Sequence, residues 1–291
     1  MGRMRYLLAI EFNLITRTNL NLSNQVKSIF CFLISVGLLM SQMATAQRAM
    51  FGSNNNYVAP PAPFQAPAFV TGSSLNLYLD AANPSSYSGS GSRWSDLSEY
   101  NHHVTLFNNP SYNAGNGGSI FTNGNNQYAT SPYVGSATDS YTFSAWFKND
   151  NRDEIKYLLS RGRDGEGNGW SLQLQISMQG IALAAVVTTV PSTVGSIATG
   201  TSTLANNTWY NVTGVWAAGQ SIKIYVNGLL QSTTNTNNTS LRTSTSGWVV
   251  GSINTSNFTS GNNAVALVYN RVLSDDEIMT NFNAVKSRFG Y

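Results

Sequence analysis

The chain has 291 residues, of which 10% are charged and 42% are hydrophobic, and its formal net charge is +3. Four of the 16 basic residues and one of the 13 acidic residues lie within positions 1–46, so positions 47–291 are formally neutral. A nucleic-acid-binding surface normally shows a basic patch, and this composition argues against one. The single cysteine, Cys31, also lies before position 47, and a chain of this length buries enough apolar surface without disulfide bonds.

The first 46 residues have the layout of an export signal. An apolar run, 29–40, follows Lys27 and is succeeded by Ala44-Thr45-Ala46. A basic residue, a short apolar run and small residues at a cleavage point are typical of a secretory signal peptide. The run is shorter than the about 17 to 25 residues that cross a bilayer, which disfavours an uncleaved anchor. We therefore expect residues 1–46 to be a signal peptide with an N-terminal extension. The mature protein is then secreted, extracellular or at the cell surface, with no membrane span.

Residues 47–72 are rich in proline, with Pro60, Pro61, Pro63 and Pro67 among them. Proline at this density favours an extended, semi-rigid segment, so we expect a Pro-rich linker or arm. Interspersed aromatic residues leave two interpretations open, a plain spacer or an arm that docks on a neighbouring subunit. Residues 73–291 remain as one domain, a length that suits a single large β-sandwich.

The rest of the chain reads as many short strands separated by turns rich in Asn, Gly and Pro. Such a series indicates an all-β sandwich or barrel, and we predict two antiparallel sheets. The predicted strands are 75–80, 103–107, 119–122, 127–130, 141–148, 156–161, 170–177, 181–189, 209–217, 221–227, 229–234, 247–252 and 263–270.

The clearest hairpin lies near residues 221–234. Ile222 and Ile224 alternate with Lys223 and Tyr225, and a period of two marks a strand with different environments on its two faces. The dipeptide at 227–228, Asn-Gly, suits the two positive-φ positions of a type I′ turn. This segment therefore predicts a tight antiparallel hairpin.

A short helix is predicted at the C-terminal end. Ser274 and Glu277 have the spacing of a capping box, in which each side chain satisfies the other residue's backbone N–H. Ile278, Phe282 and Val285 follow at i, i+4 and i+7, which places them on one helix face. We expect that face to lie on the sandwich.

Six motifs occur in a characteristic order along the chain. They are LYLDA at 77–81, WSDLS at 94–98, YTFSAW at 141–146, WYNV at 209–212, IYVNG at 224–228 and YNRVLS at 269–274. Together they resemble the laminin-G-like, concanavalin A-like jelly-roll family, including secreted and phage-associated members. The resemblance covers the chain from about residue 75 to its end, and the segment 281–290 resembles members encoded by bacteriophages and environmental bacteria.

The resemblance implies a two-sheet antiparallel jelly-roll β-sandwich with one short C-terminal helix. It also implies glycan or glycoprotein binding, often with calcium and usually without catalysis.

The resemblance implies calcium as a cofactor, although this chain lacks acidic residues at positions where the family commonly has them. Asparagine stands at 123, 262 and 263, where acidic residues are common in the family, and calcium prefers charged oxygen ligands. The best candidate metal ligands are Asp164, Glu166 and Asn168, which alternate with glycine like the first half of a calcium loop. A glutamine occupies the position of the expected bidentate glutamate, so a polar hairpin is the alternative.

Aromatic side chains are the candidate glycan-binding residues, because their faces stack on sugar C–H groups while nearby polar groups bind hydroxyls. Each candidate has an alternative role in core packing or in a turn, and Asp96 and Asn101 are expected to fix a turn through their short polar side chains. The candidates are Trp94, Tyr100, Trp146, Trp170 and Trp248.

The sequence favours a protein that is not an enzyme. His102 and His103 are adjacent and point to opposite faces if they lie on a strand, and no G-x-S-x-G nucleophile motif occurs. A glycosidase of this fold needs two carboxylates facing one bond, and the acidic clusters are 153–154 and 275–277. The second cluster is already explained by helix capping.

Three functions follow, in order of preference. The first is a secreted, non-catalytic module that binds a glycan or surface glycoconjugate in adhesion. The second is a structural subunit of a phage particle or cell-surface assembly, which would contact copies of itself or neighbouring subunits. The third is a glycosidase of the same fold.

Overall fold

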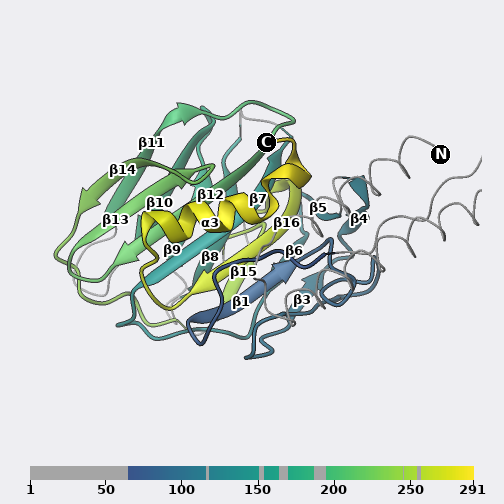
Figure 1. The fold of residues 1–291 in the computed structure, drawn as a ribbon, viewed down its shortest axis with the longest axis horizontal. Coiled ribbons are helices and arrows are strands. Elements are labelled where there is room, and N and C mark those ends of the chain that lie inside the picture. Colours follow the sequence, from purple (N-terminus) through teal and green to yellow (C-terminus); the bar gives the residue numbers. More distant parts are fainter. Residues whose placement is uncertain are drawn as a thin grey trace, which may run out of the picture. The chain divides into compact units, whose positions relative to one another are not determined.

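Two antiparallel sheets pack face to face and form the body of the molecule (Figure 1). The computed structural model describes residues 65–115, 118–150, 154–163, 170–186, 195–244, 246–253 and 257–291, all within one compact unit, Pro63–Tyr291. The predicted signal peptide and residues 47–64 of the predicted linker lie outside the described residues. The predicted two-sheet sandwich with a C-terminal helix is confirmed.

The first sheet, sheet A, has the strand order β14-β13-β12-β7-β16-β5-β4. Strand β16 pairs with β5 along its first part, residues 260–263, and with β1 along its later part, residues 265–269. The strand pairings of sheet A within the described residues are antiparallel, as expected for a jelly roll. Its strands are β1 (Leu75–Asp80), β4 (Ser111–Asn113), β5 (Ser119–Asn123), β7 (Tyr141–Asn149), β12 (Trp209–Ala217), β13 (Ser221–Val226), β14 (Leu229–Asn235) and β16 (Ser260–Tyr269).

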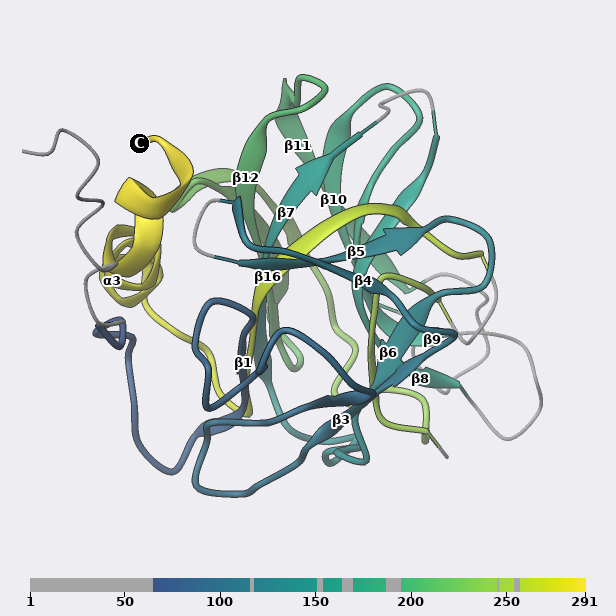
Figure 2. The same ribbon diagram turned by 90° about the vertical axis from the view of Figure 1, so that its right-hand side faces the viewer.

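The second sheet, sheet B, has the order β11-β10-β9-β8-β15-β6-β3-β2. Figure 2 shows it on the far side of sheet A from the C-terminal helix. Its strands are β2 (Arg93–Trp94), β3 (Val104–Phe107), β6 (Tyr128–Thr130), β8 (Lys156–Arg163), β9 (Trp170–Ile176), β10 (Ile181–Val186), β11 (Ser196–Thr203) and β15 (Trp248–Val250).

Alternation along each strand builds the core between the sheets. Ile222 and Ile224 of β13 point into this core and are fully buried, whereas Tyr225 belongs to a second cluster on the outer face of sheet A. The turn at Asn227 and Gly228 has φ values of 52° and 76°, which a type I′ turn requires. The predicted hairpin is therefore confirmed.

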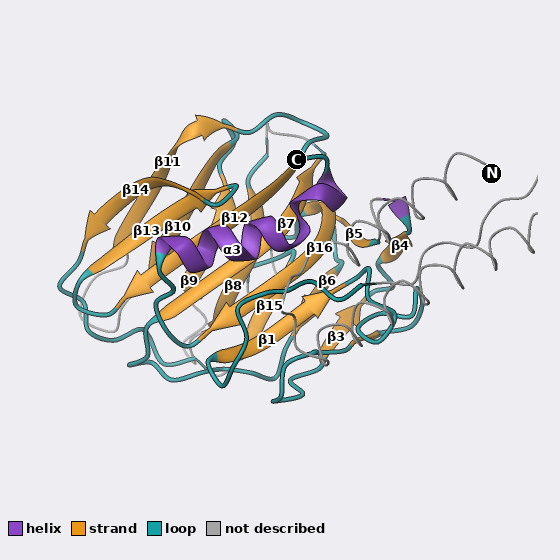
Figure 3. Cartoon of the chain, in the orientation of Figure 1, coloured by secondary structure: helices purple, strands orange, loops and turns teal. Residues whose placement is uncertain are grey.

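Helix α3 (Asp275–Val285) and the 3-10 helix η2 (Lys286–Phe289) cover the outer face of sheet A (Figures 1 and 3). Ser274 and Glu277 form the predicted capping box, and Ile278, Phe282 and Val285 are buried as predicted. Within the described ranges, no helix is long and apolar enough to cross a bilayer.

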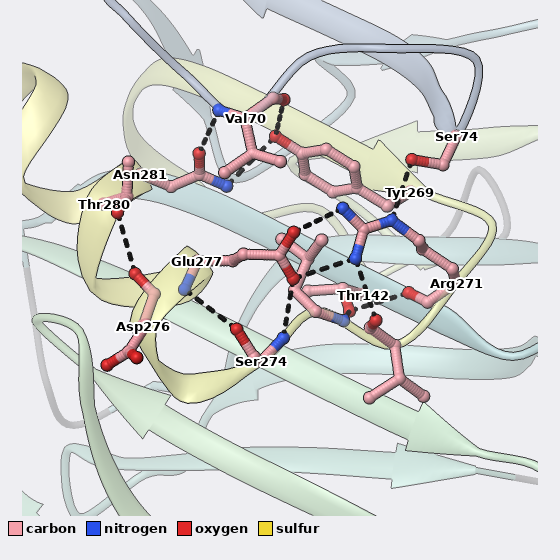
Figure 4. Close-up of polar contacts among 12 residues, drawn as sticks. Val70, Ser74, Thr142, Tyr269, Arg271, Ser274, Asp276, Glu277, Thr280 and Asn281 are labelled. Atoms are coloured by element: carbon pink, nitrogen blue, oxygen red, sulfur yellow. Dashed lines mark hydrogen bonds and ion pairs between the residues drawn. The ribbon is translucent and has the colours of Figure 1, made fainter.

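A polar network joins the start of α3 to β16 (Figure 4). The Arg271 guanidinium donates to both Glu277 carboxylate oxygens, at 2.8 and 2.6 Å. Nearby, the Tyr269 hydroxyl donates to the Val70 carbonyl at 2.8 Å, and Asn281 accepts from the Val70 N–H at 2.8 Å. Residue 70, assigned to the linker by sequence, is thus held on the helix-covered face.

The Arg271 guanidinium, helped by the Ser274 N–H, lowers the pKa of Glu277 to about 2. The pKa of Glu277 in the folded protein lies below its value of about 4.3 in the unfolded chain. The ionised Glu277 carboxylate therefore stabilises the fold at pH values above about 4.3. This stabilisation is lost as the pH falls from about 4.3 to about 2.

We therefore expect Glu277→Gln to cost about 1 kcal/mol of unfolding free energy at pH 7, since the pair is partly exposed and screened. The cost should shrink towards zero near pH 2, where wild-type Glu277 is half protonated. Urea titrations of both proteins across this pH range measure the difference. A constant difference at every pH would contradict this assignment.

Three strands escaped prediction, and the edge strand β11 shows why. Its buried positions are Ala198 and Gly200, which carry little or no side chain, so no apolar alternation marks it. Strands β2 and β4 are only two and three residues long, too short to show the alternation of apolar and polar residues that marks a strand. All three strands lie at or near sheet margins.

Candidate functional site

Three of the tryptophans proposed for glycan binding lie in the core. Trp94 and Trp248 lie on strands β2 and β15, not in loops, and pack between the sheets at 1% and 0% exposure. Trp146 does lie on the outer face of sheet A, but α3 and η2 cover it and leave 2% exposed. These positions correct the sequence interpretation, because a buried ring offers no face on which a sugar can stack.

Among the candidates whose side chains the structure describes, Tyr100 is the one left open to solvent, with 40% of its surface exposed. Its ring stacks on His102 at a centroid distance of 5.6 Å, and His102 stacks on Tyr133 at 4.6 Å. Its hydroxyl donates to the Ser73 carbonyl at 2.6 Å. Burial raises the pKa of the Tyr133 hydroxyl. This stack is fixed in place, and the role of Tyr100 in binding remains a prediction.

The remaining sequence candidates are not placed. Asp164, Glu166 and Asn168 lie outside the described residues, and the Trp170 side chain is likewise outside them, although Trp170 begins β9. Among the residues that the structure does describe, no group of three or more His, Cys, Asp or Glu side chains gathers closely enough to hold a metal ion.

Asp96 fixes a turn, as predicted. Its carboxylate accepts hydrogen bonds from the backbone N–H groups of Tyr78, Ser98 and His102, at 2.8 to 2.9 Å. Asn101 has the left-handed φ of 55° that such a turn uses. The two histidines serve the same region separately, since the His102 ring contacts the Asn76 carbonyl and the His103 ring accepts from the Asp96 N–H.

A row of aromatic rings on the outer face of sheet B was not anticipated. Phe107 stacks on Tyr128 with centroids 4.7 Å apart and planes 3° from parallel, and Tyr128 contacts Phe258 at 5.6 Å. Phe107 is 37% exposed, and the other two rings are half-buried. We call Phe107, Tyr128 and Phe258 the aromatic row.

Strand pairing explains why Phe107 and Tyr128 meet. In β3, Val104 and Leu106 face the core, so Thr105 and Phe107 face outward. Strand β6 pairs with β3 in a register that sets Tyr128 directly opposite Phe107. The spacing of the rings matches the distance of about 4.7 to 4.9 Å between neighbouring strands. An aromatic residue at an outward position of an alternating strand was the available sequence signal.

Exposed amide side chains border the aromatic row. Asn108 and Asn109 follow Phe107 with left-handed φ values of 61° and 53°. Gln127 precedes Tyr128 and donates to the carbonyl groups of both asparagines at 2.9 Å, while the Asn108 side chain donates to the Asn126 carbonyl at 2.6 Å. These bonds order the two loops against each other. Apolar rings with amides beside them suit a ligand that has both C–H faces and hydroxyl groups.

The two antiparallel sheets and the short C-terminal helix define an all-β protein of the jelly-roll class. The chain belongs to the concanavalin A-like lectin/glucanases superfamily, whose model matches residues 121–279. The resemblance drawn from the sequence motifs is thereby confirmed. No curated protein matches the chain in sequence.

Solved structures share the fold at low sequence identity. The botulinum neurotoxin serotype D binding domain matches with a TM-score of 0.56 and 15% identity, over 72% of this chain and 50% of that one. The binding domain of paraclostridial mosquitocidal protein 1 matches with a TM-score of 0.54 and 16% identity, over 72% and 52%. A Trypanosoma rangeli sialidase in complex with the inhibitor DANA matches with 0.54 and 19%, over 88% and 40%. This chain thus spans about half of these proteins or less.

Proposed function

We propose that this protein is a secreted, non-catalytic carbohydrate-binding module that acts in adhesion, with the aromatic row as its binding surface. The observation that carries the proposal is the exposed Phe107 ring, stacked on half-buried Tyr128 beside ordered amides. A sugar presents an apolar C–H face and a rim of hydroxyl groups, and this surface offers a partner for each. Membership of a lectin-containing superfamily supports the same class of ligand.

Similar structures add support for a glycan as the partner. One neighbour, at 16% identity and a TM-score of 0.56, is the binding domain of botulinum neurotoxin DC in complex with SialylT. The sialidase neighbours act on sugars through chains much longer than the part shared with this one. We transfer the ligand class from these proteins, a carbohydrate, and no particular sugar.

Catalysis is the weaker alternative. A glycosidase needs two carboxylates about 5 to 9.5 Å apart that face one glycosidic bond. Of the acidic residues considered from sequence, Glu154 is paired with buried Lys156 at 2.9 Å, and Glu277 with Arg271 at 2.6 Å. Asp153 lies outside the described residues. We therefore propose binding without catalysis.

An assembly role is the second candidate, and one observation favours it. Leu229 and Leu230 are 59% and 45% exposed at the start of β14, an edge strand of sheet A. Exposed apolar residues on an edge strand are a common place for a second chain to pair. Against this, Phe69 of the Pro-rich segment is buried on its own domain. Sedimentation analysis of the purified protein tests for self-association.

Phe107→Ala is expected to weaken glycan affinity by at least about tenfold, equivalent to about 1.4 kcal/mol, because it removes the most exposed ring of the row. A glycan array on residues 47–291 identifies a ligand, and calorimetry with that ligand measures the change. Each experiment is run with calcium and with chelator. If Asp164, Glu166 and Asn168 hold a calcium ion that binding requires, binding is lost in chelator.

Tyr100→Ala is the matched control, since Tyr100 is an aromatic residue of nearly equal exposure in a separate stack. It should leave affinity within about twofold, a change below 0.5 kcal/mol. If Tyr100→Ala abolishes binding and Phe107→Ala does not, the binding surface lies at the Tyr100 stack instead. Absence of binding to any glycan would overturn the proposed function.

A further inference from the structure

A serine-lined pocket of about 260 Å³ lies among residues 84–95, at the β2 edge of sheet B. Serine side chains make up much of its lining, with Ser88, Ser90 and Ser92 among them, and Arg93 supplies its one cationic group. Arg93 itself is exposed. The pocket therefore combines hydroxyl groups with a guanidinium.

The Arg93 guanidinium has neither a carboxylate nor a hydrogen-bond acceptor among the residues that the structure describes. The other cations discussed above are paired, Lys156 with two carboxylates and Arg271 with Glu277. A guanidinium presents a planar set of donors that matches a carboxylate or sulfate in a bidentate arrangement. Arg93 is thus available to an anionic ligand.

The pairing of β2 with β3 sets this pocket beside the aromatic row. Arg93 pairs with Thr105, and the Leu106 N–H donates to the Ser92 carbonyl at 2.7 Å, which continues the ladder by one residue. Arg93 and Phe107 are consequently diagonal neighbours on one sheet face, where long side chains about 7 to 8 Å apart still reach each other.

Gly91 lines the pocket together with Arg93 and leaves space open there. Its φ is +90°, and a Cβ atom built there meets nothing within 4 Å. Tyr128 of β6 covers one face of the Phe107 ring, and the strand order β6-β3-β2 places the strand that carries Arg93 on the other side of β3. The pocket therefore lies on the side of β3 away from Tyr128.

We propose that the ligand is an acidic glycan, with a sugar ring against Phe107 and its carboxylate or sulfate group on Arg93. The inference rests on the proposed function and adds the charge of the ligand to it. The serine residues that line the pocket supply further polar groups beside Arg93. Uronic acids, sialic acids and sulfated sugars share this chemistry.

The test compares matched glycans on one array, each in a neutral form, a carboxylated form and a sulfated form. Wild type is expected to prefer one acidic form by at least about tenfold, the size typical of a hydrogen bond to a charged group. Arg93→Gln should remove that preference and leave the neutral form bound as before, and Arg93→Lys should retain part of it. Lys148→Gln, which removes one positive charge from β7 of sheet A, is the control for net charge.

The outcomes separate this inference from the function on which it rests. Equal binding of neutral and acidic forms, or an acidic preference that survives Arg93→Gln, would overturn the role of Arg93 and leave a glycan-binding protein. Loss of the preference in Lys148→Gln as well as Arg93→Gln would also overturn it, since net charge then explains the effect. Binding of no glycan in any form would overturn both proposals.

Discussion

Trp146→Ala is expected to lower the free energy of unfolding by about 3 to 5 kcal/mol, the range for removing a large buried aromatic side chain. The Trp146 ring stacks on Phe289 at 4.2 Å and on Phe282 at 5.5 Å, so it anchors both η2 and α3 to β7. Deleting it leaves a cavity between the helices and sheet A that rigid strands fill poorly. Urea unfolding monitored by far-ultraviolet circular dichroism measures the change.

Two variants sharpen this prediction. Trp146→Phe should cost less than half as much, because it keeps an aromatic ring and removes an indole N–H that has no partner among the described residues. Met178→Ala, at a side chain that is 60% exposed, should change stability by less than about 0.5 kcal/mol. A cost below about 1 kcal/mol for Trp146→Ala would show that α3 contributes little to the stability of the fold.

Arg288→Met is expected to cost about 3 to 5 kcal/mol, because it strips the partner from a buried carboxylate. Asp80 is fully buried and accepts two hydrogen bonds from the Arg288 guanidinium, each 3.0 Å long. The pair joins β1, the first strand of the domain, to η2 near the end of the chain. Methionine keeps most of the aliphatic stem, so the loss reports the charge and its hydrogen bonds.

A double-mutant cycle isolates the interaction. Asp80→Asn combined with Arg288→Met should cost less than the sum of the single changes, by about 1 to 3 kcal/mol, since no charge is then left buried alone. Arg271→Met is the comparison at an exposed pair and should cost only about 1 kcal/mol. Strict additivity in the cycle would mean that Asp80 and Arg288 stabilise the fold independently.

Much of the fold is predictable because its signals are local. The alternation in β13, the Asn-Gly turn after it and the capping box of α3 each depend on residues within one short segment. Edge strand β11 shows no alternation of apolar and polar residues, and it is recognised by its pairing with β10, which a local sequence pattern cannot reveal. Local periodicity therefore gave the sandwich and left its edges incomplete.

The candidate site was much less predictable, since its members come from separate segments. Phe107 and Phe258 approach the same Tyr128 ring from 21 residues before it and 130 residues after it, as their positions in the sequence show. Trp146 shows how a local pattern misleads. It shares a strand face with Thr142 and Ser144, and two hydroxyl side chains on one face indicate contact with solvent. In the structure the helix layer covers this face, the Thr142 hydroxyl donates to the Arg271 carbonyl, and the Ser144 hydroxyl is hydrogen-bonded to that of Thr213.

The helix layer on sheet A also determines how the domain is oriented when it is attached to a surface. Val70, close to the first described residue, is bonded to Asn281 of α3, and the hydroxyl of the final residue, Tyr291, donates to the Trp209 carbonyl. Both ends of the described domain therefore lie on the helix-covered side. The aromatic row lies on the outer face of sheet B. Figure 2 shows that sheet on the far side of sheet A from the helix. A domain immobilised on a sensor chip or on a cell close to Val70 or Tyr291 would therefore present the aromatic row on the side away from the attachment.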